Sequence, residues 1–156
     1  MKGIIIHPGL CIGCERCVLW CSLRKASVQN PARSRIHVIH SEPSVDEPVI
    51  CTQCGLCIAA CPLGAISRDT KTGAVVIDEA KCNGCSQCVP VCPFGVITID
   101  PDSKKALKCD LCGGEPACVP ACPVNALEYV DIKNLAYHRR LAEATANTIQ
   151  GIYMKK

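Results

Sequence analysis

The sequence has few aromatic residues and no long apolar run. Phe, Trp and Tyr together make up 3% of its 156 residues, with one Trp and one Phe, which excludes a conventional aromatic core. No apolar stretch approaches the roughly 18 residues of a membrane-spanning helix, so we expect no membrane span. Blocks of like charge are missing as well, and the Lys and Arg residues are scattered, which argues against a nucleic-acid partner.

Cysteine, by contrast, is abundant and regularly spaced. The 16 cysteines form four groups of four, and the first three groups share one spacing of two, two and three intervening residues. Groups two, three and four each end in Cys-Pro. This spacing is typical of bacterial [4Fe–4S] ferredoxins, in which the fourth cysteine of a run ligates the other cluster of a pair. Sixteen thiolates at four per cluster predict four [4Fe–4S] clusters. The groups are Cys11, Cys14, Cys17, Cys21; Cys51, Cys54, Cys57, Cys61; Cys82, Cys85, Cys88, Cys92; and Cys109, Cys112, Cys118, Cys122.

Disulfides and zinc are the two alternative uses of these thiols. A disulfide scaffold needs an oxidising compartment and usually a secretory leader, and the ten residues before Cys11 are too short for a signal peptide. Zinc sites typically use two Cys-x-x-Cys pairs separated by a long gap, whereas here three ligands follow one another in one short loop. We therefore expect iron–sulfur clusters in a reducing cytoplasm.

The formal net charge of +3 is misleading for such a protein, because it counts every cysteine as neutral. An oxidised [4Fe–4S] core with four thiolates carries a charge of −2. Four such sites take the formal charge to about −5, so the sequence pI near 8.1 is no evidence for nucleic acid.

An internal repeat predicts the secondary structure. Each unit reads as a three-cysteine loop, a short helical turn with the fourth cysteine, a turn at proline, and a strand. The helix at Cys21 is expected to continue past it, because no proline follows. Residues 41–48 read as an acidic linker, and residues 113–117 as a loop that bulges outward. Strands are expected at 3–7, 36–40, 65–69, 74–78, 96–100 and 126–130.

The tail, residues 131–156, has no cysteine and shows helical spacing of its apolar residues. Tyr137, Leu141 and Ile152 lie on one face, and Leu135 and Ile149 on another. Two apolar stripes on one helix need two surfaces to cover them. The tail therefore reads either as a helix packed on its own chain or as a docking helix for a larger subunit.

Four motifs carry a resemblance to a known family over residues 4–130: CIGCERCVLWC, CTQCGLCIAACP, CNGCSQCVPVCP and CDLCGGEPACVPACP. The sequence resembles the four-cluster ferredoxin-type electron-transfer subunits of multi-subunit oxidoreductases, and it is most similar to the small subunit of tungsten-dependent aldehyde oxidoreductases. The resemblance implies an α+β fold with two bacterial dicluster ferredoxin-like lobes. One lobe would comprise residues 1–48 and 104–130, the other residues 49–103, followed by the C-terminal docking helix at 131–156.

The resemblance also implies which cysteines share a cluster. The first and fourth groups would exchange their last cysteines, and so would the second and third. The implied ligand sets are Cys11, Cys14, Cys17, Cys122 (cluster a); Cys109, Cys112, Cys118, Cys21 (cluster b); Cys51, Cys54, Cys57, Cys92 (cluster c); and Cys82, Cys85, Cys88, Cys61 (cluster d).

No separate catalytic constellation is present, so we expect an electron-transfer subunit that is not an enzyme by itself. The implied partners are a larger catalytic subunit with a tungsten or molybdenum cofactor, and a flavin- or NAD-linked subunit or a ferredoxin as the second redox partner. End-to-end self-association is a further expectation. Two alternatives stay open: a free polyferredoxin that serves a hydrogenase, formate dehydrogenase or carbon monoxide dehydrogenase, and a redox-sensing or assembly protein.

Overall fold

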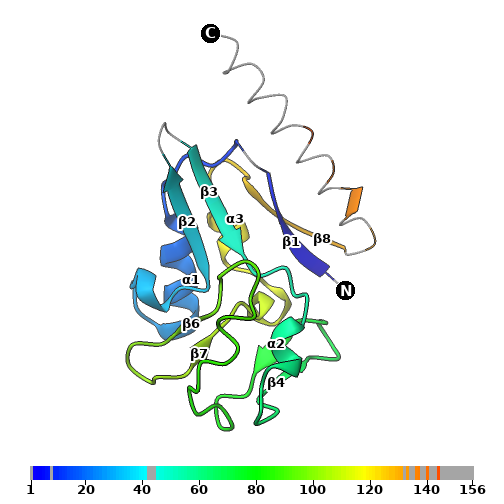
Figure 1. Ribbon diagram of the computed structural model, residues 1–156. Helices are drawn as coiled ribbons and strands as arrows, with labels where there is room; N and C mark the ends of the chain where they lie inside the picture. Colours follow the sequence, from blue (N-terminus) through cyan, green and yellow to red (C-terminus); the bar gives the residue numbers. More distant parts are fainter. Residues whose placement is uncertain are drawn as a thin grey trace.

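The protein is built from four small two-stranded sheets and a few short helices, as the computed structural model shows (Figure 1). The structure describes residues 2–7, 9–41 and 45–131, together with Lys133, Ala136, Tyr137, Arg140 and Ala144. All four described sheets are antiparallel pairs. The expected α+β class is confirmed.

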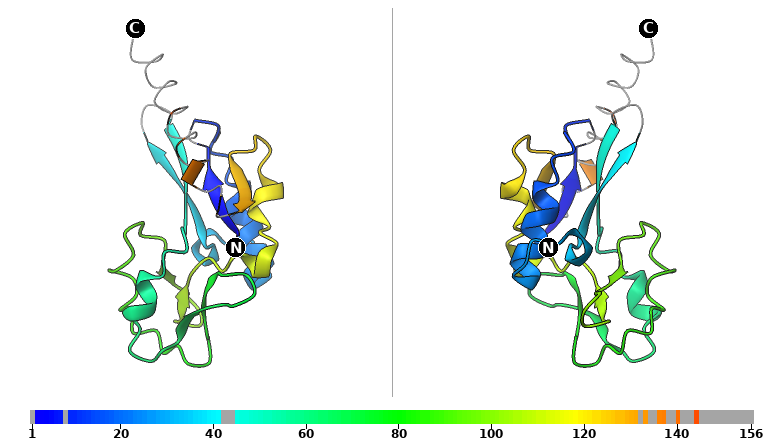
Figure 2. Two further views of the ribbon diagram at one scale, coloured as in Figure 1. Left: turned by 90° about the vertical axis from the view of Figure 1, so that its right-hand side faces the viewer. Right: turned by 90° about the vertical axis from the view of Figure 1, so that its left-hand side faces the viewer.

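The two ends of the chain meet in one sheet. Strand β1 (Lys2–Ile6) pairs with β8 (Leu127–Asp131), with Ile4 opposite Tyr129. Next to this sheet, helix α1 (Arg16–Ala26) packs against α3 (Cys118–Ala121). Figure 2 shows these early and late segments side by side, with residues of the middle of the chain beneath them. The first and fourth cysteine groups therefore lie together, although about 90 residues separate them.

Helix α1 continues beyond Cys21, as predicted. Cys17, Val18, Cys21 and Ser22 are buried and form one face of the helix. The helix ends at Ser27, whose left-handed backbone lets its N–H donate to the Leu23 carbonyl. Burial of one face, rather than intrinsic helix propensity, explains why this helix extends beyond the last cysteine of the group.

Residues 41–48 are not only a linker, and that prediction is wrong from Val45 onward. Strand β3 (Val45–Ile50) pairs with β2 (Ile36–Ser41), and Ile36 lies opposite Ile50, both buried. Pro48 is tolerated because each strand of a two-stranded sheet is an edge strand, so a missing N–H breaks no second ladder. In the sequence, acidic residues and a proline interrupt the β-branched residues that precede Cys51, so this strand was not predicted.

The middle of the chain repeats a short pattern twice. The expected strands appear in shortened form, and in the third cysteine group the expected helical turn is a run of hydrogen-bonded turns between Ser86 and Cys92. Strand β7, at Ala106–Leu107, was not expected from the sequence, and it lies beyond residue 103. The elements are α2 (Leu56–Ala59), β4 (Ile66–Arg68), β5 (Val75–Ile77), β6 (Thr98–Ile99), β7 (Ala106–Leu107), and the 3-10 helices η1 (Pro31–Arg33) and η2 (Leu111–Gly114).

The hydrophobic core consists of two buried clusters, and the first of them joins distant parts of the described chain. Ile4 from β1, Ile36 from β2, Ala74 before β5 and Leu111 in η2 belong to one buried cluster. Cysteines fill much of the rest of this core, since seven of the sixteen are buried. The two halves are tied further by an ion pair between Arg33 and Asp100, 2.9 Å apart. Sulfur thus takes the place of the missing aromatic side chains.

The segment 113–117 does not simply bulge outward. Gly113 and Glu115 are exposed, but Pro116 is buried. A Cβ on Gly114 would lie 3.7 Å from the Thr72 methyl group, in the turn between β4 and β5. The insertion in the fourth cysteine group therefore packs against the middle of the chain.

Five tail positions are described, and all five are helical and exposed. The apolar stripes predicted from Leu135, Leu141, Ile149 and Ile152 lie outside the described residues. Among the helices that the structure describes, none is long and apolar enough to span a membrane.

Candidate metal centres

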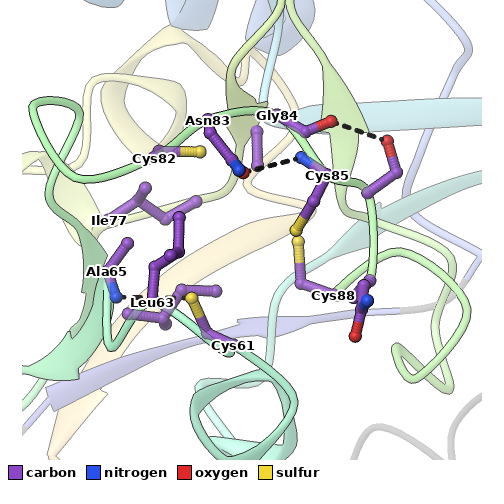
Figure 3. A pocket seen from close by; sticks show the side chains of 13 residues that line it. Cys61, Leu63, Ala65, Ile77, Cys82, Asn83, Gly84, Cys85 and Cys88 are labelled. Carbon is purple, nitrogen blue, oxygen red and sulfur yellow. Dashed lines mark hydrogen bonds between the residues drawn. The ribbon is translucent and has the colours of Figure 1, made fainter.

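One set of four cysteines lines a hollow in the middle of the chain. Cys82, Cys85 and Cys88 come from one loop, and Cys61 follows α2. Figure 3 shows their sulfurs turned toward a common space. Within this loop the Cys85 N–H donates to the Asn83 side chain, at Oδ1, over 3.1 Å. These are the residues expected to hold cluster d.

A second hollow is lined by Cys21, Cys109, Cys112 and Cys118. Cys21 comes from α1, Cys109 precedes η2, Cys112 lies within η2, and Cys118 begins α3. The backbone at Cys112 is left-handed (φ 51°), which turns the chain between the first two of these three cysteines. A single hollow thus combines the four residues expected to hold cluster b, from segments about 90 positions apart.

In the other two expected sets, several cysteines influence the pKa of a neighbouring cysteine in the same set. The pKa of Cys17 is raised to about 12, mainly by burial and also by the neighbouring Cys11, Cys122 and Cys14. Burial also raises the pKa of Cys57, and Cys51 and Cys54 add to the rise. Cys92 packs against the buried cluster that contains Cys57. The structure therefore brings the cysteines of set a together, and it places Cys92 against the same buried cluster as Cys57.

Thiols of different expected sets influence one another's pKa values. The pKa of Cys118 is raised mainly by burial and also by Cys17, a cysteine of the expected set a. The pKa of Cys109 is raised to about 12, mainly by burial and also by Cys51 of the expected set c. The pKa of Cys88 is raised by burial and by Cys57, across the expected sets d and c. These influences link a with b, b with c and c with d.

The donor set suits iron–sulfur clusters. Buried thiols with raised pKa values stay protonated unless a cation compensates their charge, so binding of iron and folding are coupled. Among the described residues, no three His, Cys, Asp or Glu side chains converge closely enough to hold a single metal ion. Instead, groups of four soft sulfur donors spread around hollows, which is the arrangement a multi-iron cluster requires. When bound, such a cluster supplies one-electron redox chemistry.

Backbone amides point at several of the sulfurs. The N–H groups of Ala65 and Ala126 donate to Cys61 and Cys122 at 3.3 and 3.2 Å. Both alanines stand four residues after the fourth cysteine of a Cys-Pro group, so the repeat in the sequence becomes a repeated hydrogen bond. The Arg35 N–H makes a similar bond to Cys21 at 3.3 Å. Donors to sulfur stabilise the more negative, reduced state of a cluster.

Two residues between sets b and c were not expected from the sequence. Gln53 and Lys108 are 5% and 4% exposed, and their side chains hydrogen-bond to each other at 3.0 Å. A glutamine within a cysteine loop and a lysine before a cysteine both resemble ordinary surface residues. Only their position at the contact between two segments buries them.

Gly84 offers a test of how tightly the set d loop is built. Its φ is +76°, and a Cβ would lie 2.0 Å from the Lys104 backbone oxygen. Gly64 has a similar φ of +58° but nothing within 4 Å. We expect Gly84→Ala to cost about 2–4 kcal/mol of stability and Gly64→Ala about 1 kcal/mol, because only the first adds a backbone clash to the strained φ.

The stability difference is measured as the urea concentration that bleaches the visible iron–sulfur absorption, with iron content determined in parallel. Equal midpoints for the two variants would show that the loop can move away from Lys104.

Models of known protein families identify the class of this protein. A model described as a 4Fe-4S dicluster domain matches residues 45–132, and a second model of the same description matches residues 10–65. The chain belongs to the 4Fe-4S dicluster ferredoxin family. With its 16 cysteines it carries four [4Fe–4S] clusters, and it is an iron–sulfur protein.

Individual relatives are subunits of oxidoreductases. The chain is 44% identical, over 71% of its length, to "Aliphatic sulfonate oxidoreductase, polyferredoxin-like subunit" of Pyrococcus furiosus. It is 36% identical, over 85% of its length, to "NADH-dependent phenylglyoxylate dehydrogenase subunit beta" of Aromatoleum evansii. The matches span 65% and 31% of these relatives, less than two thirds of either.

A solved structure gives the same picture of the fold. The chain is similar to a chain of the active site complex BamBC of benzoyl coenzyme A reductase, as isolated. The TM-score is 0.50 and the identity 27%, over 96% of this chain and 97% of that one.

Proposed function

We propose that this chain is the electron-conducting subunit of a larger oxidoreductase, with its clusters held by the four ligand sets a to d. The observation that carries the proposal is the hollow formed by Cys21, Cys109, Cys112 and Cys118. Three of its thiols follow one another and the fourth comes from the other end of the chain, which is the exchange that a dicluster ferredoxin requires.

The order of the sets defines a path for electrons. Set a lies next to b, b next to c, and c next to d, through the thiol pairs that influence each other's pKa values. Electrons would enter at one end of this row and leave at the other. Cys14 of set a and Cys85 of set d are exposed, as is Cys54 of set c, so both end sets would be accessible to partners.

We further propose the two-lobed division expected from the sequence. Residues 1–48 and 104–130 would carry clusters a and b, and residues 49–103 would carry c and d. The β1–β8 pairing supports the discontinuous lobe, because it joins the two ends of the chain. Strand β7 pairs with β6 of the other lobe. This pairing and the Arg33–Asp100 ion pair would hold the lobes together. The tail, 131–156, would dock on a partner.

The proposed partner is a larger catalytic subunit of the tungsten- or molybdenum-dependent aldehyde oxidoreductase type. Two relatives named as subunits of a sulfonate oxidoreductase and a phenylglyoxylate dehydrogenase support a role in a complex. The resemblance of the four cysteine motifs to the small subunits of tungsten enzymes supports the metal. The second redox partner would be a flavin- or NAD-linked subunit or a ferredoxin in the cytoplasm, where thiols stay reduced.

Purification of the tagged protein from its own host, without oxygen, tests this function. We expect about 16 irons per chain and a much larger subunit that contains tungsten or molybdenum. A tagged chain that ends at residue 130 is the control, and we expect it to keep its iron but lose the large subunit. Zinc in place of iron would contradict the cluster assignment. A four-cluster protein that purifies alone from native cells would favour the free polyferredoxin instead.

A further inference from the structure

We propose that Lys108 is a fixed buried positive charge that raises the reduction potentials of the two middle clusters, b and c, above those of a and d. This inference rests on the proposed ligand sets and on the order a, b, c, d. Lys108 would thereby favour the presence of an electron at the step between the two lobes.

The position of Lys108 is fixed by three hydrogen bonds. Its Nζ donates to Gln53 Oε1 at 3.0 Å, to the Val75 carbonyl at 2.6 Å and to the Cys109 carbonyl at 2.7 Å. These three acceptors use all three donors of an ammonium group. The side chain is 4% exposed, so water does not screen its charge.

Gln53 completes the junction. Its amide Nε2 donates to the Cys109 carbonyl at 3.0 Å, and its Oε1 accepts from the Val75 N–H at 2.9 Å. Its own N–H lies 3.4 Å from the Cys51 sulfur. Lys108 and Gln53 therefore lie between Cys109, a ligand of set b, and Cys51, a ligand of set c.

No acidic side chain neutralises Lys108 among the described residues. All three of its acceptors are neutral, and no described carboxylate lies within ion-pair distance of it. The other cations near set b are different, because Lys25 and Arg35 both pair with Asp110. A buried ammonium without a counter-charge is costly. The negative charge of the clusters on both sides supplies the missing compensation.

Lys108 lies next to ligands of both sets. Its Nζ bonds to the carbonyl of Cys109, which belongs to set b, and to Gln53, whose N–H lies 3.4 Å from the sulfur of Cys51 in set c. A positive charge beside both sets stabilises the additional negative charge that either cluster takes up on one-electron reduction.

Two variants abolish the net positive charge at this position in different ways. Lys108→Met keeps the length of the side chain but has no charge. Gln53→Glu keeps Lys108 and its hydrogen bond and places a carboxylate beside it. Lys105→Gln is the matched control, because Lys105 is a lysine of the same segment but is only half-buried, and its Nζ bonds to the Glu79 carbonyl.

The measurement is an anaerobic redox titration followed by electron paramagnetic resonance, with iron determined for every sample. In both charge variants we expect two of the four clusters to become harder to reduce by at least about tenfold in equilibrium constant, or about 59 mV per tenfold for one electron. The other two clusters and all four in Lys105→Gln should keep their potentials.

Full iron content with unchanged potentials in either charge variant would overturn the proposal. If Lys108→Met binds less iron, Gln53→Glu decides the question. If neither variant binds four clusters, Lys108 is needed for assembly and the role in setting potentials is rejected. Iron content and the number of spectroscopically distinct clusters in the unaltered protein test the proposed function separately, so the two ideas fail on different readouts.

Discussion

Replacing Cys109 with Ser is expected to divide the row of clusters in its middle. Cys109 is a proposed ligand of set b, and its pKa is influenced by Cys51 of the proposed set c, so its loss would remove the link between the two pairs. We expect iron to fall from about 16 to about 12 per chain. A partner enzyme that delivers electrons at set d should then reduce only two clusters, c and d. The number of clusters reduced by that partner, followed by paramagnetic resonance, is the measurement.

Cys14→Ser is the matched control for this experiment. Cys14 belongs to set a at the end of the row and is exposed. Its variant should lose the same amount of iron, yet the same partner should still reduce three clusters. If Cys109→Ser also allowed reduction of three clusters from one end, the order a, b, c, d would be wrong.

Removal of iron is expected to unfold the protein. Seven cysteines are buried and several of them lie at the centre of the hydrophobic clusters. Each described sheet has only two strands, and a two-stranded sheet is at best marginally stable by itself. Structural metal sites contribute roughly 10 kcal/mol or more to folding, which exceeds the stability of many small domains at about 5–15 kcal/mol.

An oxidant and a chelator, applied together, remove the iron. We expect loss of far-ultraviolet circular dichroism in step with loss of visible absorption, and recovery of both only when iron and sulfide are supplied with reductant. Addition of reductant alone serves as the control, because it should not restore the structure. Retention of native dichroism after complete iron loss would show that the apolar core is sufficient.

Much of the site follows from local sequence. Three cysteines in one short loop must lie close together whatever the rest of the chain does, so the spacing alone predicted three thiols of each set. The Cys-Pro repeat likewise predicted the turn and the strand that follow it, because proline and the cluster loop are local constraints. The spacing could not say which set takes each fourth cysteine, and that expectation came from the family resemblance.

Other features were decided by contacts between distant segments. Strand β3 was read as a linker, because its acidic residues and Pro48 are unfavourable in a strand until β2 lies beside them. Lys108 and Gln53 read as surface residues, because a single sequence does not show that β5 and the start of the fourth group close over them.

The sequence by itself thus determined the chemistry of this protein: sixteen soft ligands, in four local groups, for four iron–sulfur clusters. Only the tertiary structure decided which fourth thiol faces which hollow, the order in which the sets touch, and where an unpaired positive charge is buried. The physical reason is that ligand type and short spacing are local properties, whereas proximity and burial depend on how β1 and β8 bring the ends of the chain together.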